Sequence, residues 1–186
     1  SLPVKNVEEL IAYDKANPGK LNYGSSGTGS RVHLGIELFN QIAGTRLTHV
    51  PYKGGGPLMN DLLGGQVQLT FSAMIGAVPY IRSNRLRAIA VTNPRRSSLS
   101  PDLPTAAETI PGYELMGYFG ILGPKGLPRE IIALWNSEIN RILKLPDVRE
   151  RMSSDGVEPV GGSPEQFREM LRLDIAKWQK VVKVGN

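Results

Sequence analysis

The sequence has 186 residues, of which 40% are hydrophobic and 21% charged, and it carries a formal net charge of +5. These values are typical of one globular domain or two small ones, and no apolar run is long enough to cross a membrane. The sequence contains no cysteine, which excludes thiol catalysis, disulfides and cysteine-ligated metals. Its basic residues are too scattered for a nucleic-acid surface, so we expect no nucleic-acid partner.

Helices and strands alternate along the first half of the chain. The apolar periodicity predicts helices over 6–17, 30–42, 57–63 and 75–82, and strands over 21–24, 46–52, 66–73 and 86–92. Asn6 and Glu9 have the spacing of a capping box at the first helix. Because each strand is joined to the next by a helix, the pattern favours an α/β fold with a doubly wound, mostly parallel sheet.

The second half is mainly helical. After a loop over 93–104, capping-box spacings at Thr105 with Glu108 and at Ser163 with Gln166 mark two helix starts. The patterns predict helices over 128–145, 147–154 and from Ser163 onward, and short strands over 118–124 and 157–160. These two strands have too few neighbours to form a sheet of their own. The chain thus divides into an alternating α/β part over 1–111 and a mainly helical part over 112–186.

A loop rich in glycine and hydroxyl residues, from Gly24 to Ser30, lies between the first predicted strand and the second predicted helix. Such a loop can bind an anion, because the first backbone N–H groups of a helix have no partner within the helix and the helix dipole is positive there. Alternatively, the glycines only satisfy the geometry of a turn, and the serines only cap the helix.

Three sharper interpretations of this loop fail on single residues. A phosphate-binding loop for ATP or GTP needs a lysine where Ser30 stands, a dinucleotide fingerprint lacks its third glycine at Val32, and no serine has glycines two positions away on both sides. We find no convincing catalytic constellation, and His33 and His49 are poorly spaced for a metal site. The sequence therefore predicts binding rather than catalysis, with no cofactor and no metal.

Two further loops follow strands in the same way. Tyr52, Lys53 and Gly54 come after the second strand, and Ser72 and Ala73 end the third. Parallel sheets bring such loops to one edge, where ligands bind. Lys53 either contacts the ligand or is solvated, and Tyr52 either lines the site or packs. We expect local capping or packing for His33, a structural role for His49, and a surface or hydrogen-bonding role for Asp61.

Five ordered segments carry a resemblance to a known family: NYGSSGTGSRVHLGIELFNQIAG, THVPYKGGGPLMNDLLGGQV, LRAIAVTNPRRSSLSPDLPTAAE, YFGILGPKGLP and KWQKVVK. Over nearly the whole chain, the sequence resembles the substrate-binding proteins of tripartite tricarboxylate transporters, the TctC or Bug family. The resemblance implies a periplasmic receptor with two α/β lobes. Such a receptor closes on a small carboxylate (a di- or tricarboxylate, an amino acid or an aromatic acid) and delivers it to a membrane permease.

The resemblance also implies which residues bind the ligand. The family's carboxylate loop matches Ser25, Ser26, Gly27, Thr28, Gly29 and Ser30, and the same cleft wall would contain Tyr52, Lys53, Gly54, Ser72 and Ala73. No segment matches the family's N-terminal stretch or a signal peptide. The resemblance therefore implies that 1–111 form the family's complete second lobe and 112–186 the returning, mainly helical part of an incomplete first lobe. We expect a processed chain that is either a fragment or a naturally shortened member, and whose incomplete lobe either pairs as a homodimer or stays partly mobile. The alternatives are a sensor module for the same ligands and an α/β enzyme acting on a small anion.

Overall fold

The structure, a computed structural model, describes residues 2–184 and separates into two compact units. The first unit extends to Gly117, and the second runs from Tyr118 to Val184. The boundary predicted from the sequence, between 111 and 112, lies slightly earlier in the chain. The assignment of the two parts to the lobes of a binding protein stays a prediction.

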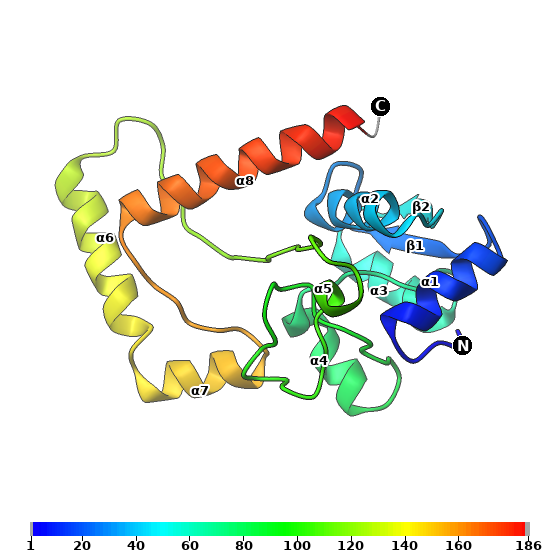
Figure 1. Cartoon of the computed structure of the whole chain (residues 1–186). Helices are drawn as coiled ribbons and strands as arrows, with labels where there is room; N and C mark the ends of the chain where they lie inside the picture. The colour runs from blue at the N-terminus through cyan, green and yellow to red at the C-terminus, as the bar shows by residue number, and fades with distance from the viewer. Residues whose placement is uncertain (1, 185–186) are drawn as a thin grey trace. The chain divides into compact units, whose positions relative to one another are not determined.

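The first unit alternates strands and helices over its first half, as Figure 1 shows. Helices α2 and α3 both contact β1, and α1 contacts α5. In chain order the elements are α1 (Val7–Ala16), β1 (Asn22–Ser25), α2 (Arg31–Ala43), β2 (Thr48–Pro51), α3 (Gly55–Gly64), α4 (Met74–Arg82) and α5 (Ala106–Thr109).

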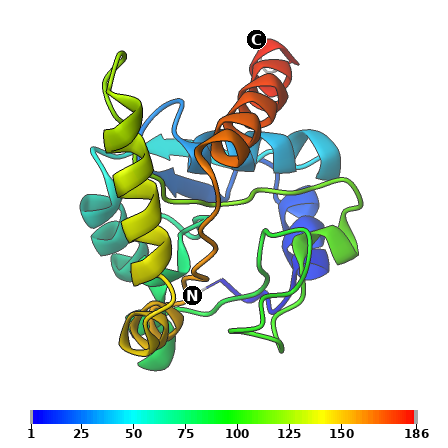
Figure 2. The same ribbon diagram turned by 90° about the vertical axis from the view of Figure 1, so that its left-hand side faces the viewer.

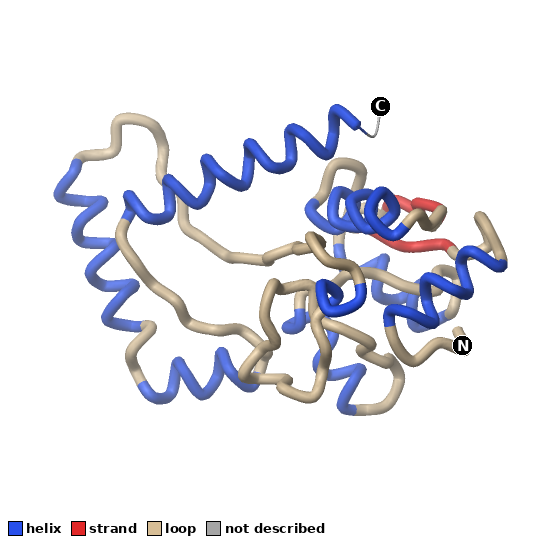
Figure 3. The backbone as a smooth tube through the Cα atoms, viewed as in Figure 1, coloured by secondary structure: helices blue, strands red, loops and turns tan. Residues whose placement is uncertain are grey.

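The sheet of the first unit is parallel, which confirms the predicted α/β class. Strand β1 pairs with β2 in a register that places Tyr23 beside His49, and the two arrows run the same way in Figure 2. On its other side β1 forms a parallel bridge with Leu69. The predicted strands over 66–73 and 86–92 are wrong in extent, because within the described residues each is reduced to a single bridge, at Leu69 and Val91 (Figure 3).

Aromatic side chains form the centre of the core of the first unit. The rings of Phe39, Phe71 and Tyr113 meet edge to face, with centroids 5.6–6.2 Å apart. The buried Tyr113 hydroxyl donates to the carbonyl of Gly35, and burial raises its pKa. Helix α2 packs on this core through Ile36 and Phe39, which are both buried.

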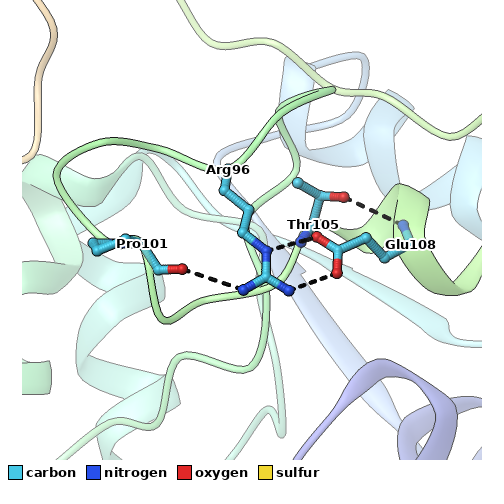
Figure 4. Close-up of polar contacts among 4 residues, drawn as sticks. All are labelled: Arg96, Pro101, Thr105 and Glu108. Atoms are coloured by element: carbon cyan, nitrogen blue, oxygen red, sulfur yellow. Dashed lines mark hydrogen bonds and ion pairs between the residues drawn. The ribbon is translucent and has the colours of Figure 1, made fainter.

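The loop over 93–104 is closed by one side chain, Arg96 (Figure 4). Its guanidinium donates two hydrogen bonds to Glu108, at 2.9 and 2.7 Å, and a third to the carbonyl of Pro101. Glu108 also accepts from the Thr105 N–H while Thr105 accepts from the Glu108 N–H, so the predicted capping box is confirmed. Arg96 thus ties the loop to the start of α5.

The second unit consists of α6 (Arg129–Ile142), α7 (Pro146–Ser154) and α8 (Pro164–Val184), joined by extended segments. The predicted strands over 118–124 and 157–160 are wrong: within residues 2–184 both segments are irregular. A strand needs a neighbour for its N–H and C=O groups, and neither segment pairs with one among the described residues. The capping box at Ser163 and Gln166 is confirmed.

Large apolar side chains are exposed in the second unit. Leu134 and Trp135 on α6 are 57% and 56% exposed, and Ile121 is 64% exposed. Trp178 is half-buried and donates from its indole N–H to Asp174. Between residues 2 and 184 no helix combines the length and the apolar character that a membrane crossing requires.

Candidate functional site

Three parallel segments bring the predicted loops to one edge of the sheet. Strand β1 lies between β2 and the segment around Leu69, so all three carboxyl ends point the same way. The order is fixed by backbone bonds on both sides of β1: the Tyr52 N–H donates to Ser25, and the Gly24 N–H donates to Leu69. The Thr70 hydroxyl adds a bond of 2.8 Å to the Gly24 carbonyl. Each segment then leads into a helix, α2, α3 or α4.

The glycine loop, defined here as residues 25–30, is a tight turn between β1 and α2. Gly27 and Gly29 have φ angles of 138° and 76°, which side chains rarely adopt, so these two glycines are required by the backbone. Ser30 is the N-cap of α2 and accepts from the His33 N–H, and its own N–H donates to the Gly27 carbonyl. The capping interpretation of Ser30 is therefore correct.

The second loop lies against the first. A Cβ added to Gly27 would stand 3.6 Å from the Tyr52 carbonyl oxygen, which shows how close the two loops are. Gly54, with a φ of 104°, turns the chain into α3. The Tyr52 hydroxyl donates to Asp61 on α3 at 2.8 Å, and burial together with this bond raises the pKa of Tyr52. Lys53 is exposed.

The third loop is placed at the same edge by Thr70, two residues before Ser72. Ser72 and Ala73 are both exposed, and Ala73 is the N-cap residue of α4. The Ser72 hydroxyl donates to the carbonyl of Ala73, within its own loop. The structure therefore brings the first two predicted loops into direct contact and puts the third at the end of the neighbouring parallel segment.

A partly buried polar cluster beside the glycine loop was not found by sequence reasoning. The Ser25 hydroxyl lies 2.6 Å from Nε2 of His49, whose ring is stacked between those of Tyr23 and His33. The Tyr23 hydroxyl donates to Glu37 at 2.7 Å, and burial followed by this bond raises the pKa of Tyr23. The only sequence signal was the presence of both histidines near the loop, and the register that joins them is not visible in the sequence.

The Ser25–His49 pair has the distance of a nucleophile and its base, but it is not accessible. Ser25 is completely buried, and its hydroxyl also donates to the Gly27 carbonyl. The exposed members of the glycine loop are Ser26, Thr28 and Gly29. Among residues 2–184, no three His, Asp or Glu side chains gather as a metal site requires. This exposed surface can offer N–H and hydroxyl donors at the start of α2, which suits an anion.

A family model described as "Tripartite tricarboxylate transporter family receptor" matches residues 1–186. The chain belongs to this family. Protein BugT of Bordetella pertussis (strain Tohama I) is 37% identical over 183 residues, and a protein from the tcbD–tcbE intergenic region of Pseudomonas sp. (strain P51) is 34% identical over 180. These alignments include 98% and 96% of this chain but only 56% and 54% of the relatives. The chain thus spans about half the length of these curated relatives.

Solved structures of TctC-family proteins share the fold. Rpa4515 of R. palustris, solved with adipate, gives a TM-score of 0.94 at 38% identity, covering 100% of this chain and 62% of that one. MatC (Rpa3494) of Rhodopseudomonas palustris, solved with bound malate, gives 0.85 at 30% identity, covering 97% and 63%. Both neighbours carry dicarboxylates, and one further match is a structure of the periplasmic binding protein BugD.

Proposed function

We propose that this TctC-family chain contributes one wall of the site of a receptor for small carboxylates. One observation carries the proposal: the glycine loop precedes α2 and lies, through Ser25 and Gly27, directly against the Tyr52–Gly54 loop, which precedes α3. Two helix N-termini at one sheet edge favour an anion, since their unpaired N–H groups and dipoles act together. Adipate and malate in the neighbouring structures have the matching chemistry.

The residues divide into supporting and contacting groups. Ser25, Gly27 and Ser30 use hydrogen-bonding groups to shape the turn, so we assign them to its support. Ser26, Thr28 and Lys53 have exposed side chains, and we assign them to ligand contact together with the backbone of Gly54. The Gly29 N–H already donates to Nδ1 of His33, so we assign Gly29 to the support of the turn. Ser72 and Ala73 extend the same edge. Lys53 supplies the one full positive charge among these residues, which favours a carboxylate over a neutral ligand.

A binding experiment with a matched glycine control tests this site. We expect adipate, malate, succinate or citrate to raise the melting temperature; a ligand at about a hundred times its Kd stabilises a protein by ~2.7 kcal/mol. Gly27→Ala should abolish the shift. Gly19→Ala is the control, because Gly19 also has a positive φ, of 72°, but lies before the amino end of β1. Equal loss in both variants, or no shift with any acid, would overturn the proposal.

We further propose that the receptor works in the periplasm without turnover and passes its ligand to a membrane permease. The description of the family as a transporter receptor and the periplasmic neighbours support this step. Capture of the permease from detergent extracts, with and without ligand, is the direct test. Capture of a signalling protein instead would favour the sensor alternative, and consumption of the acid during incubation would favour the enzyme.

The homodimer stays a prediction, supported by the apolar side chains of the second unit. Phe119, Leu122 and Val160 are 77%, 73% and 88% exposed, which is unusual for side chains of this size. Light scattering on the purified protein and on Phe119→Glu tests it. We expect a dimer that the substitution dissociates, whereas a monomeric wild-type protein would contradict the prediction.

A further inference from the structure

Two imidazoles connect the beginning and the end of the glycine loop. At the beginning, the Ser25 hydroxyl meets Nε2 of His49 at 2.6 Å. At the end, the Gly29 N–H donates to Nδ1 of His33 at 3.1 Å. The two rings stack with their centroids 4.0 Å apart and an interplanar angle of 21°. The loop is therefore held at both ends by one continuous polar column.

The hydrogen bonds of Ser25 fix the tautomer of His49. A serine hydroxyl has one proton, and that of Ser25 goes to the Gly27 carbonyl at 3.0 Å. The oxygen also accepts the Gly27 N–H at 3.2 Å. The remaining bond, to Nε2 of His49, is then assigned to the imidazole as donor. In this assignment His49 carries its proton on Nε2 and supports the loop as a donor.

The bond at the other end fixes the state of His33. Nδ1 of His33 accepts an N–H, which is possible only when that nitrogen carries no proton. His33 is therefore neutral, with its proton on Nε2. Adding a proton to Nδ1 removes the acceptor, breaks the bond to Gly29 and places a positive charge against the ring of His49.

Two further titratable groups, Tyr23 and Glu37, adjoin the stacked rings of His33 and His49. Tyr23 stacks on His49 with centroids 5.0 Å apart and donates to Glu37 on α2. Burial lowers the pKa of His49, the neighbouring His33 lowers it further, and the Glu37 carboxylate opposes both effects. The site thus favours a neutral His49.

We infer that His33 and His49 are positioning residues that hold the glycine loop in its binding shape, and that protonation of His33 releases Gly29 and weakens ligand binding. The inference deepens the proposed function and rests on it for the ligand. Its physical basis is preorganisation: a loop already held in the bound shape loses less entropy on binding. The charge gained by His33 attracts an anion, but it acts in screened solvent, and we expect the loss of loop order to dominate.

The test uses variants that separate hydrogen bonding from titration. Asparagine places an acceptor oxygen near the position of Nδ1 but does not titrate. His33→Asn should therefore keep wild-type affinity for adipate at neutral pH and should not lose affinity at acidic pH through this side chain. His33→Leu should weaken binding about tenfold at every pH, as expected for one lost hydrogen bond. His49→Gln should preserve a donor to Ser25, and His49→Leu should not. Titration calorimetry at neutral and acidic pH measures each affinity, and the Asn variant corrects for protonation of adipate itself.

A second measurement needs no ligand. Nitrogen-15 NMR of the free protein should report Nε2–H tautomers for both histidines, and the Gly29 amide should shift as His33 titrates. A proton on Nδ1 of His33 at neutral pH, or a Gly29 amide unmoved in His33→Leu, would overturn the inference. If no acid binds while the NMR signatures are as expected, the proposed ligand class is wrong and the positioning role stands.

Discussion

The structure that the sequence patterns predict forms more completely in the first unit than in the second. In the first unit, strand and helix patterns produce a parallel sheet, a buried aromatic core and a loop edge with interlocking hydrogen bonds. In the second, the helices form where the patterns place them, but their apolar faces stay exposed and the predicted strands do not form. The difference shows that helix formation needs only local contacts, whereas strands and cores need partners from elsewhere.

The largest expected effect compares one aromatic ring from each unit. Phe39→Ala removes a ring that is 1% exposed and touches Phe71 and Tyr113, so it should cost ~3–5 kcal/mol of unfolding free energy. Trp135→Ala removes a larger side chain that is 56% exposed and should change stability by less than ~0.5 kcal/mol. Urea unfolding measures both. A comparable cost at Trp135 would mean that the second unit is packed in solution.

The next comparison uses two crowded glycines. A Cβ at Gly24 would overlap a methyl group of Leu58, which is buried and cannot move, so Gly24→Ala should cost ~1–3 kcal/mol. A Cβ at Gly120 would overlap the ring of Phe167, which is only half-buried and can turn away. Gly120→Ala should therefore cost less than ~1 kcal/mol.

Thermal melts of the two glycine variants decide this comparison. Gly64→Ala is the control, because no atom beyond its chain neighbours lies within 4 Å of the added methyl group and α3 gains a better helix former. It should stabilise the protein by ~0.4–1 kcal/mol. Equal costs at Gly24 and Gly120 would show that the ring of Phe167 is as firmly held as Leu58.

Helix caps give a smaller contrast. Thr105, which is buried, and Ser163 both accept a backbone N–H at the start of a helix. Thr105→Ala should cost ~1–2 kcal/mol because it leaves a donor without a partner in a packed region, and Ser163→Ala ~0.5–1 kcal/mol. Hydrogen exchange at the Glu108 and Gln166 amides, combined with thermal melts, separates global loss from local fraying. A larger global loss at Ser163 would reverse the ranking.

The caps also show what the sequence could predict. Asn6, Thr105 and Ser163 each contact a residue three positions later, so their spacing alone identified them. The glycine loop was located in the same way, from a strand, a turn and a helix that follow one another. His49 could not be connected to Ser25, because that contact depends on the register of β1 and β2, which are separated by a whole helix.

The two strands predicted in the second half did not form, because a strand also depends on a contact from elsewhere in the chain. The segments over 118–124 and 157–160 have the apolar composition of strands, but composition does not supply a neighbouring backbone. Likewise, the apolar stripe of α6 predicted which residues share a face, including Trp135, and could not say whether anything covers that face.

The smallest expected effect depends on pH and compares two exposed ion pairs. The hydrogen bonds from Arg96, followed by that from the Thr105 N–H, lower the pKa of Glu108 to about 2. A carboxyl whose pKa is lowered by folding stabilises the native state above its unfolded pKa, and this contribution disappears as the pH falls toward the folded value. Arg96→Gln should therefore lower the melting temperature slightly at about pH 6, and the difference should vanish near pH 2.

Arg172 provides the matched pair in the second unit. It lowers the pKa of Glu169 on the same helix, three residues away, whereas Arg96 joins a loop to Glu108 across twelve positions of the chain. Because closing that loop restricts far more backbone than an i,i+3 contact on one helix, Arg172→Gln should leave the melting temperature unchanged at both pH values. A pH-dependent loss at Arg172 equal to that at Arg96 would mean that local pairs hold the second unit together as effectively as long-range pairs hold the first.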